Sequence, residues 1–209
     1  MDRYLKVGEV LGLEAEEARF SLEVPPFARR SAARILDGPP ALPRPYIGLA
    51  PGARWRTKLW PPENFARAAR LLVERFGGTV LLTGTVGEAG EAGRKIEREA
   101  PGAVVNLIGR TSLEELVALY ARFDLVITPD TGLMHIADAL GVPLVAVFGP
   151  TDPARTGPYF QRRRVVTSGA CDKAPCFRRK CPLEYCEAMA AVSGDEVYRR
   201  AAAVLEGED

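Results

Sequence analysis

The sequence predicts an α/β domain with a doubly wound parallel sheet. Three observations carry this prediction. From Tyr46 onward, short strand patterns alternate five times with helical patterns. The strand patterns are continuous apolar runs rather than alternating ones, so both faces of each strand are expected to be covered. The chain has 209 residues, of which 47% are hydrophobic and 26% charged, as in an ordinary globular domain.

The helices of the alternating region show apolar residues at helical spacing and clear end signals. The first has Phe65, Leu72 and Phe76 on one face and stops at Gly77–Gly78. Ser112 and Glu115 form a capping box at a later helix start. In chain order, the expected elements are strand 46–50, helix 62–76, strand 79–84, helix 88–100, strand 103–109, helix 111–123, strand 124–129, helix 133–140, strand 143–149, strand 163–169 and helix 194–206.

The first 45 residues differ from this regular region. An amphipathic segment at 14–22 and a helical segment at 28–36 precede a proline-rich connector, GPPALPRP, at 38–45. Such a connector is typical of a boundary between folded units. We therefore expect residues 1–45 to be a lead-in and residues 46–209 to form the α/β domain.

Charge and hydropathy argue against several classes of protein. The chain has 28 basic and 27 acidic residues and a net charge of +1, so nucleic acid is not expected as a partner. No apolar run approaches the roughly 18 residues that a transmembrane helix needs. The start of the chain is too charged for a secretory signal. The expectation is a cytoplasmic protein.

Ligands of open parallel sheets bind beyond the carboxyl ends of the strands. The residues that carry chemistry are therefore expected in the loops that follow the predicted strands. These loops are 51–58, 84–90, 109–112, 129–133 and 149–157.

The turn at 129–133 links a strand to a helix. Free N–H groups at a helix start attract anions, Gly132 allows close approach, and Thr131 adds a hydroxyl donor, so the turn favours a diphosphate. The alternative is that Asp130 or Thr131 is simply an N-cap. Because Asp130 would repel a phosphate, we expect it to position the loop or to contact a ribose. His135, the only histidine, lies one turn into the helix and either faces the ligand or is structural.

A second candidate is APGARWRTKLWPPENF at 50–65, which follows the first regular strand. Its basic and hydroxyl residues are Arg54, Arg56, Thr57 and Lys58. A glycine loop with threonine and lysine beyond a parallel strand suits a phosphate, although the Walker A spacing is absent. The alternative is a solvated basic loop, with Trp60 and Phe65 packing in the core.

The glycine-rich stretch TGTVGEAG at 83–90 is a third candidate. Its glycines are spaced G-x-x-G-x-x-G, which is not the dinucleotide-binding pattern G-x-G-x-x-G. Glu88 is suited to accept hydrogen bonds from ribose hydroxyls. A plain turn explains the same residues equally well.

All four cysteines lie within one short segment, separated from one another by four residues each. They are Cys171, Cys176, Cys181 and Cys186. Four thiolates with this spacing can close a tetrahedral zinc site, but the usual paired C-x₂-C pattern is absent. Disulfides and free thiols in a packed loop remain alternatives. No second histidine is present to make a catalytic Cys/His pair.

Taken together, these blocks resemble glycosyltransferase family 9, the ADP-heptose:lipopolysaccharide heptosyltransferases of Gram-negative bacteria. The resemblance spans roughly residues 1–205. It rests on D-T-G-L-M-H with F-G-P-T-D-P in 130–153, P-G-A-R-W at 51–55, LIGRTSLEELVAL at 107–119 and CFRRKC at 176–181.

The resemblance implies a GT-B fold, in which two Rossmann-like domains enclose the active site. Residues 1–45 would be the end of the N-terminal domain and the interdomain linker, and residues 46–209 the Rossmann-like nucleotide-sugar-binding domain. It implies donor-binding roles for Thr57 and Lys58 at the diphosphate, Glu88 at the ribose, Thr111 and Ser112 near the base, and Asp130, Thr131, Gly132, Leu133 and His135 around the donor.

For the complete enzyme, the resemblance implies inverting transfer of a heptose-like sugar from an ADP-activated donor. The acceptor would be a lipid-linked saccharide of the lipopolysaccharide core, reached at the inner membrane surface by a cytoplasmic, peripheral enzyme. No metal is required if Lys58 and the helix start at 131–133 stabilise the leaving ADP. A supporting Mg²⁺ and a structural zinc stay open.

The family's acceptor loop and catalytic base belong to its N-terminal domain, and MDRYLKVGEVLGLE matches neither. We therefore expect this chain to be a donor-binding part that is inactive alone, either truncated or completed by a separate N-terminal half. The alternative is a non-catalytic nucleotide-binding or interaction module completed by another chain.

Overall fold

The computed structural model describes residues 10, 20–183 and 185–208. They contain one six-stranded sheet, in which every neighbouring pair of strands is parallel. The strand order is β3-β2-β1-β4-β5-β6. The strands are β1 (Tyr46–Leu49), β2 (Thr79–Leu82), β3 (Val104–Asn106), β4 (Leu125–Pro129), β5 (Leu144–Phe148) and β6 (Val165–Thr167). The prediction of a parallel α/β sheet, including its sixth strand, is confirmed.

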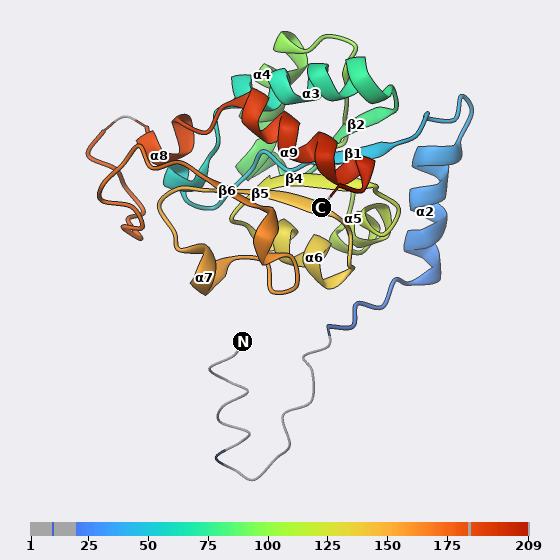
Figure 1. The fold of residues 1–209 in the computed structure, drawn as a ribbon. Coiled ribbons are helices and arrows are strands. Elements are labelled where there is room, and N and C mark those ends of the chain that lie inside the picture. Colours follow the sequence, from blue (N-terminus) through green and yellow to red (C-terminus); the bar gives the residue numbers. More distant parts are fainter. Residues whose placement is uncertain (1–9, 11–19, 184, 209) are drawn as a thin grey trace.

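Helices cover both faces of the sheet (Figure 1). One face is covered by α3 (Pro62–Phe76), α4 (Val86–Glu99) and α9 (Gly194–Glu206), with the short α8 (Glu187–Ala190) at its edge. The other face is covered by α2 (Pro26–Asp37), α5 (Leu113–Tyr120) and α6 (Gly132–Ala139). The remaining elements are α7 (Pro153–Thr156) and two 3₁₀ turns, η1 (Arg56–Lys58) and η2 (Arg162–Arg164).

Successive residues of the strands enter two different cores. In β4, Leu125 and Ile127 pack under α3 and α9, whereas Val126 packs against α5 and α6. A strand that is buried on both sides needs apolar residues at every position, because neighbouring side chains point to opposite faces. This explains the continuous apolar runs in the sequence.

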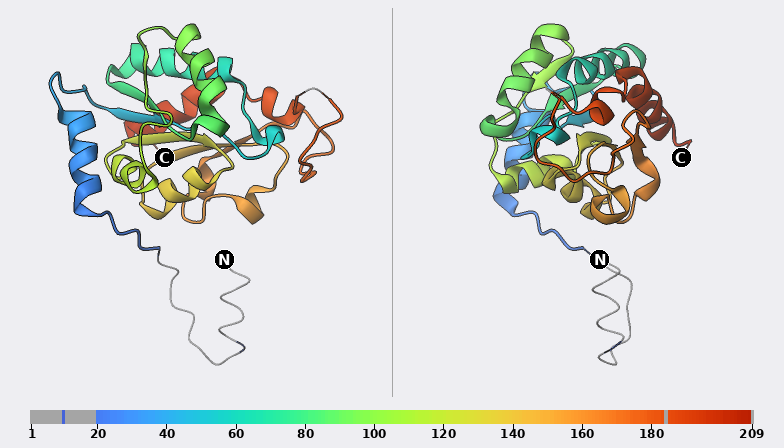
Figure 2. Two further views of the ribbon diagram at one scale, coloured as in Figure 1. Left: turned by 180° about the vertical axis from the view of Figure 1, so that it is seen from behind. Right: turned by 90° about the vertical axis from the view of Figure 1, so that its left-hand side faces the viewer.

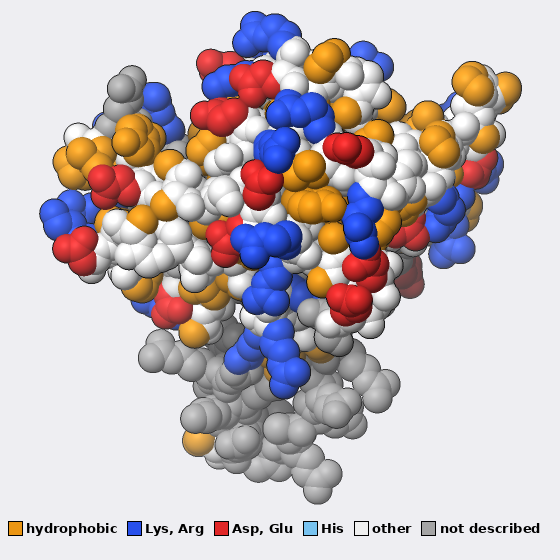
Figure 3. All heavy atoms as spheres, turned by 45° about the horizontal axis from the view of Figure 1, so that its top comes forward, with side chains coloured by type: hydrophobic (Ala, Val, Ile, Leu, Met, Phe, Trp, Pro, Cys, Tyr) orange, Lys and Arg blue, Asp and Glu red, His pale blue; other side chains and the backbone are white. Residues whose placement is uncertain are grey.

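The solvent side of α3, α4 and α9 carries basic and acidic side chains in a mixed pattern (Figure 3). Arg67 pairs with Asp195, and Arg75 pairs with Glu206, so that α3 is joined to α9 by two exposed ion pairs. Exposed pairs of this kind contribute little stability. The mixed pattern agrees with the net charge of +1.

The strand order places the reversal of the sheet between β1 and β4, which is where open α/β sheets bind their ligands. In Figure 1, the chain enters β1 from the side of α2, so the carboxyl ends of the strands lie on the opposite side. The cysteine-rich segment runs along that edge, and the right-hand view of Figure 2 faces it.

Part of the lead-in shares the core of the domain. The helix α2 packs against α5, and its Ala28, Ala32 and Leu36 are fully buried. The expected amphipathic segment at 14–22 lies mostly outside the described residues. The assignment of residues 1–45 to the end of another domain stays a prediction.

Two features of the chain differ from the sequence-based expectation. Helix α4 begins at Val86 rather than 88, because Thr85 accepts a hydrogen bond from the Glu88 N–H at 3.4 Å and acts as its N-cap. The expected glycine-rich loop is therefore largely the first turns of a helix. The short helices α7 and α8 were not expected, since four residues show no periodicity. No helix in the described ranges is long and apolar enough to cross a membrane.

Candidate functional site

An ion pair joins the ends of the two strands at the sheet reversal. Lys58, in the turn η1 after β1, places its Nζ 2.7 Å from Oδ2 of Asp130, which directly follows β4. The two side chains are only 16% and 6% exposed. A charge pair this deep has lost most of its hydration, so each partner depends on the other.

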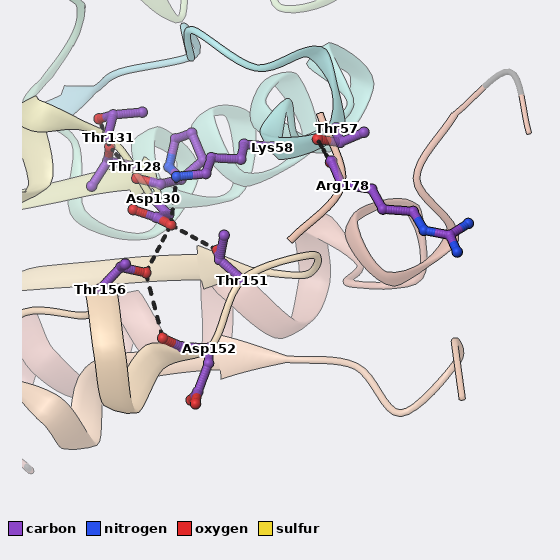
Figure 4. Close-up of polar contacts among 10 residues, drawn as sticks. Thr57, Lys58, Thr128, Asp130, Thr131, Thr151, Asp152, Thr156 and Arg178 are labelled. Atoms are coloured by element: carbon purple, nitrogen blue, oxygen red, sulfur yellow. Dashed lines mark hydrogen bonds and ion pairs between the residues drawn. The ribbon is translucent and has the colours of Figure 1, made fainter. Parts of the chain in front are cut away.

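Two threonines from the next strand connection hold the same carboxylate oxygen (Figure 4). The hydroxyl of Thr151 donates to Asp130 Oδ2 at 2.7 Å, and the hydroxyl of Thr156 donates to it at 3.0 Å. Thr151 follows β5, and Thr156 ends α7. One oxygen thus gathers residues from the carboxyl ends of β1, β4 and β5, and Asp130 fixes the geometry of three loops.

The helix that follows Asp130 begins with free N–H groups. Thr131 occupies the N-cap position of α6, yet within the described structure its side chain makes no capping hydrogen bond. Its hydroxyl instead shares a hydrogen bond of 3.2 Å with the hydroxyl of Thr128. Gly132, the first residue of α6, is exposed. Neither Asp130 nor Thr131 acts as a side-chain cap, so the first turn is free to receive an anion.

The basic loop after β1 is held on both sides. Thr57 is buried and donates its hydroxyl hydrogen to the carbonyl oxygen of Arg178 at 2.7 Å. Trp60 and Phe65 are fully buried with their ring centroids 4.5 Å apart, so both belong to the core as expected in the alternative interpretation. The loop is solvated only in part: Arg54 and Arg56 are exposed, whereas Lys58 is paired with Asp130 and Thr57 is buried.

The other predicted donor residues lie at the starts of α4 and α5, beyond β2 and β3. Glu88 is exposed in the first turn of α4. Thr111 is half-buried, and Ser112 completes the expected capping box: its Oγ accepts from the Glu115 N–H, and its own N–H donates to the Glu115 carboxylate. These residues share the carboxyl edge of the sheet with Lys58, but within the described part of the chain no hydrogen bond or ion pair joins them to the Asp130 group.

One buried polar contact supports the end of β2. The hydroxyls of Thr83 and Tyr120 share a hydrogen bond of 2.9 Å, and both residues are fully buried. Burial raises the pKa of Tyr120 far above its usual range, since a phenolate there would lose its hydration. Tyr120 therefore stays neutral and holds Thr83, which precedes the helix that carries Glu88.

Two predicted residues lie on α6 itself. Leu133 is half-buried and packs against the core under α5 and α6, whereas His135 is exposed. An exposed imidazole on a short helix at the ligand edge agrees with the ligand-facing alternative better than with a packed one. Its role stays a prediction.

Comparison with known proteins decides the family. The model of glycosyltransferase family 9 (heptosyltransferase) matches residues 2–186. The chain belongs to glycosyltransferase family 9.

Individual members of family 9 agree with this assignment. The chain is 38% identical over 128 residues to lipooligosaccharide heptosyltransferase 2 of Haemophilus influenzae, which covers 59% of this chain and 36% of that protein. The structure of E. coli ADP-heptose lps heptosyltransferase II matches with a TM-score of 0.72 and 30% identity, covering 90% of this chain and 54% of that one. The E. coli heptosyltransferase WaaC with ADP shares the fold, with a TM-score of 0.61 and 20% identity, over 94% of this chain and 53% of that one.

The family assignment confirms the resemblance drawn from the sequence blocks. The matches also show how much of a family member is present: this chain spans about a third of the length of the first curated relatives it matches. The fold neighbours are covered to about half of their length. The activity of a complete enzyme therefore comes to this chain as a proposal.

The cysteines of this family 9 chain are free thiols, each half-buried. Within residues 20–183 and 185–208, no group of three or more His, Cys, Asp or Glu side chains is arranged to hold a metal ion. The zinc prediction thus gains no support from the geometry, and the disulfide alternative is not realised. The metal state of the segment stays a prediction.

One of these thiols should react slowly. Burial raises the pKa of Cys186, and the neighbouring thiols of Cys181 and Cys176 raise it further, so less thiolate is present at a given pH. We expect Cys186 to be alkylated by iodoacetamide more slowly at pH 8 than a cysteine in an unstructured peptide. Mass spectrometry of timed samples measures this rate. An increase on adding a chelator would instead show that a bound metal protects the thiols.

The sequence analysis missed the residues that hold Asp130. It placed the loop 149–157 at the ligand edge but assigned no role to Thr151 or Thr156. The available signal was the pair of threonines in T-D-P-A-R-T, five residues apart in a loop beyond a buried strand. Only the tertiary structure shows that both hydroxyls point to one carboxylate.

Proposed function

We propose that this chain is the donor-binding part of a heptosyltransferase, which takes a heptose-like sugar from an ADP-activated donor to an acceptor of the lipopolysaccharide core. The observation that carries the proposal is the pair of Lys58 and Asp130 beside the free start of α6, at the reversal of the sheet. It is supported by relatives that are named lipopolysaccharide heptosyltransferases and by a fold neighbour solved with ADP.

In this proposal the donor lies along the carboxyl edge. Its diphosphate contacts the first N–H groups of α6, the hydroxyl of Thr131 and the ammonium of Lys58, with Thr57 keeping that loop in place. The nucleoside extends toward the starts of α4 and α5. There Glu88 accepts from the ribose hydroxyls and the turn at Thr111–Ser112 borders the base. The sugar is left beside Leu133 and His135.

The chemistry follows from how the diphosphate is held. An acceptor hydroxyl attacks the anomeric carbon, the bond from that carbon to the diphosphate oxygen breaks, and ADP departs with the electron pair. The N–H groups of α6 and Lys58 stabilise the negative charge that develops on ADP. They are fixed before the reaction, which is what makes such stabilisation effective.

The acceptor proton must go to a base, and Asp130 is unsuited to take it. Its Oδ2 already receives the Lys58 ammonium and two threonine hydroxyls. With three donors already on it, this oxygen has no lone pair left for the acceptor proton. We therefore propose that the base comes from outside this chain, as in the family's N-terminal domain, and that the chain alone transfers no sugar.

Donor binding in this proposal does not depend on a metal ion. We propose that cationic groups of the protein, Lys58 and the start of α6 among them, take the place of Mg²⁺ or zinc in donor binding. The acceptor would be a lipid-linked saccharide, presented at the cytoplasmic surface of the inner membrane to an enzyme that binds there peripherally.

Isothermal titration calorimetry of the purified chain tests donor binding. We expect ADP and ADP-heptose to bind, and UDP- and GDP-sugars to bind at least roughly tenfold more weakly, because a pocket shaped for one base leaves polar groups unpaired with another. Unchanged affinity after removal of Mg²⁺ by EDTA is part of the expectation. Equal affinity for all three nucleotides would contradict the ADP assignment, and no binding of any would contradict the proposed function.

A further inference from the structure

The middle of the cysteine-rich segment crosses the ligand edge and touches the loops on both sides. We refer to residues 177–179 as the strap. At one end, the N–H of Phe177 donates to the carbonyl of Pro150, in the loop after β5, at 2.8 Å. At the other end, the buried hydroxyl of Thr57 donates to the carbonyl of Arg178 at 2.7 Å (Figure 4). The strap thus joins the two loops that supply Lys58 and Thr151 to Asp130.

Contacts with neighbouring residues, rather than the intrinsic backbone preference of its own residues, maintain the conformation of the strap. Phe177 has a φ of 53°, in the left-handed region that residues other than glycine, and bulky ones above all, rarely adopt. The guanidinium of Arg155 lies 4.7 Å from the centre of the Phe177 ring and covers it. Strained backbone that is kept by contacts on both sides occurs preferentially at ligand sites.

The strap ends in a cation, Arg179, that contacts the same aromatic ring as Lys58. The guanidinium of Arg179 is 5.0 Å from the centre of the Trp55 indole, and the ammonium of Lys58 is 4.6 Å from the same centre. Both cations are therefore placed by one ring, through the attraction of positive charge to an aromatic face. Trp55 itself is half-buried in the loop after β1.

The charge of the site explains why a second cation is needed. The ammonium of Lys58 is already matched by the carboxylate of Asp130 at 2.7 Å, so the pair has no net charge. A helix start contributes only about half a positive charge. A diphosphate carries more negative charge than that, and more still when it leaves as ADP. The strap brings one further cation, Arg179, to the Trp55 ring that Lys58 also contacts.

We propose that Arg179 is a second phosphate-binding cation of the donor site, delivered by the strap and oriented by Trp55. A guanidinium is suited to this task because its planar fork donates two hydrogen bonds to two phosphate oxygens. The inference rests on the proposed function for the identity of the nucleotide, but the anion that it requires is the diphosphate alone.

The test compares two substitutions in the same segment by calorimetry. Arg179→Gln removes the proposed contact. Lys180→Gln removes an equal charge next to it, from an exposed side chain that makes no hydrogen bond or ion pair with the described part of the chain. We expect Arg179→Gln to weaken binding of ADP and of inorganic pyrophosphate by roughly tenfold or more, as loss of a hydrogen bond to a charged group does. We expect Lys180→Gln to change either affinity less than about twofold, and Arg179→Lys to lie between.

The two probes separate this inference from the proposed function. Pyrophosphate binding that is lost in Arg179→Gln supports the inference even if ADP does not bind the wild type, in which case the proposed function alone falls. Equal pyrophosphate affinity in the wild type and in Arg179→Gln overturns the inference. An equal loss in Lys180→Gln also overturns it, because the effect would then be general attraction. A wild type that binds neither probe overturns both.

Discussion

Replacing Lys58 with alanine is expected to weaken ADP binding by roughly 100-fold, because the change acts twice on the same site. It removes the ammonium that we propose to contact the diphosphate. It also leaves the carboxylate of Asp130, only 6% exposed, without its counter-charge. A charge that stays buried after its partner is removed repels an incoming anion and carries much of the penalty. Titration calorimetry with the wild type and the variant measures the ratio.

A second substitution separates the two effects. The double variant Lys58→Ala with Asp130→Asn no longer has the unpaired carboxylate. We therefore expect it to bind ADP roughly tenfold more tightly than Lys58→Ala does, which corresponds to about 1.4 kcal/mol. Arg54→Ala is the matched control, since it removes an exposed cation from the same loop. We expect it to change the affinity by less than about threefold.

Either of two results would contradict this account of Lys58. If Lys58→Ala binds ADP as well as the wild type does, its ammonium is not at the diphosphate. If the double variant binds no better than Lys58→Ala, then the charge of Asp130 is not the source of the additional loss. Arg54→Ala with a loss as large as that of Lys58→Ala would indicate general attraction rather than a specific contact.

The sheet was predictable from the sequence because its signals are local. In β4, Leu125, Val126 and Ile127 are all apolar, and such a run requires cover on both faces wherever the strand lies in the sheet. The end of a helix at Gly77–Gly78 is set by the same few residues that display it. Because ligands bind at the carboxyl ends of such strands, the positions of the candidate loops followed as well.

The glycines of the third candidate belong to two different structures. Gly84, with a φ of 135°, is a turn residue before the helix, whereas Gly87 and Gly90 lie in the first turns of α4. In the same helix, a Cβ on Gly93 would clash with Cδ1 of Ile108, so a larger residue there would require the end of that side chain to shift. Gly90 is buried in the same helix. Close approach between elements depends on tertiary structure, and the sequence of one segment does not display it.

The position of Asp130 could be questioned from the sequence, but its partners could not be identified there. A carboxylate next to a phosphate is unfavourable, and the sequence offered loop positioning or ribose contact as explanations. The structure pairs the carboxylate with Lys58 and with two threonines, which favours loop positioning. These partners are 72, 21 and 26 residues away in the chain, and their convergence depends on the strand order rather than on any local pattern.

The largest loss of stability is expected from Trp60→Ala. Trp60 is fully buried, packs edge-on against Phe65, and donates its indole N–H to the carbonyl of Val192 at 2.8 Å. Truncating a buried tryptophan costs about 4 kcal/mol, from the lost burial and the cavity left behind. The melting temperature should fall by roughly 10 °C, given about 2–4 °C per kcal/mol for a chain of this size. Thermal unfolding followed by circular dichroism measures the change.

The chain offers a matched control for this variant five residues earlier. Trp55 is the same residue type in the same loop, but it is half-buried and contacts two cations rather than the core. Trp55→Ala should therefore lower the melting temperature by only a few degrees, about a quarter of the effect of Trp60→Ala. Trp60→Phe keeps most of the apolar volume but loses the bond to Val192, so we expect a loss of about 1–2 kcal/mol. If Trp60→Ala were no less stable than Trp55→Ala, Trp60 would not be the residue that fixes the Lys58 loop to the core.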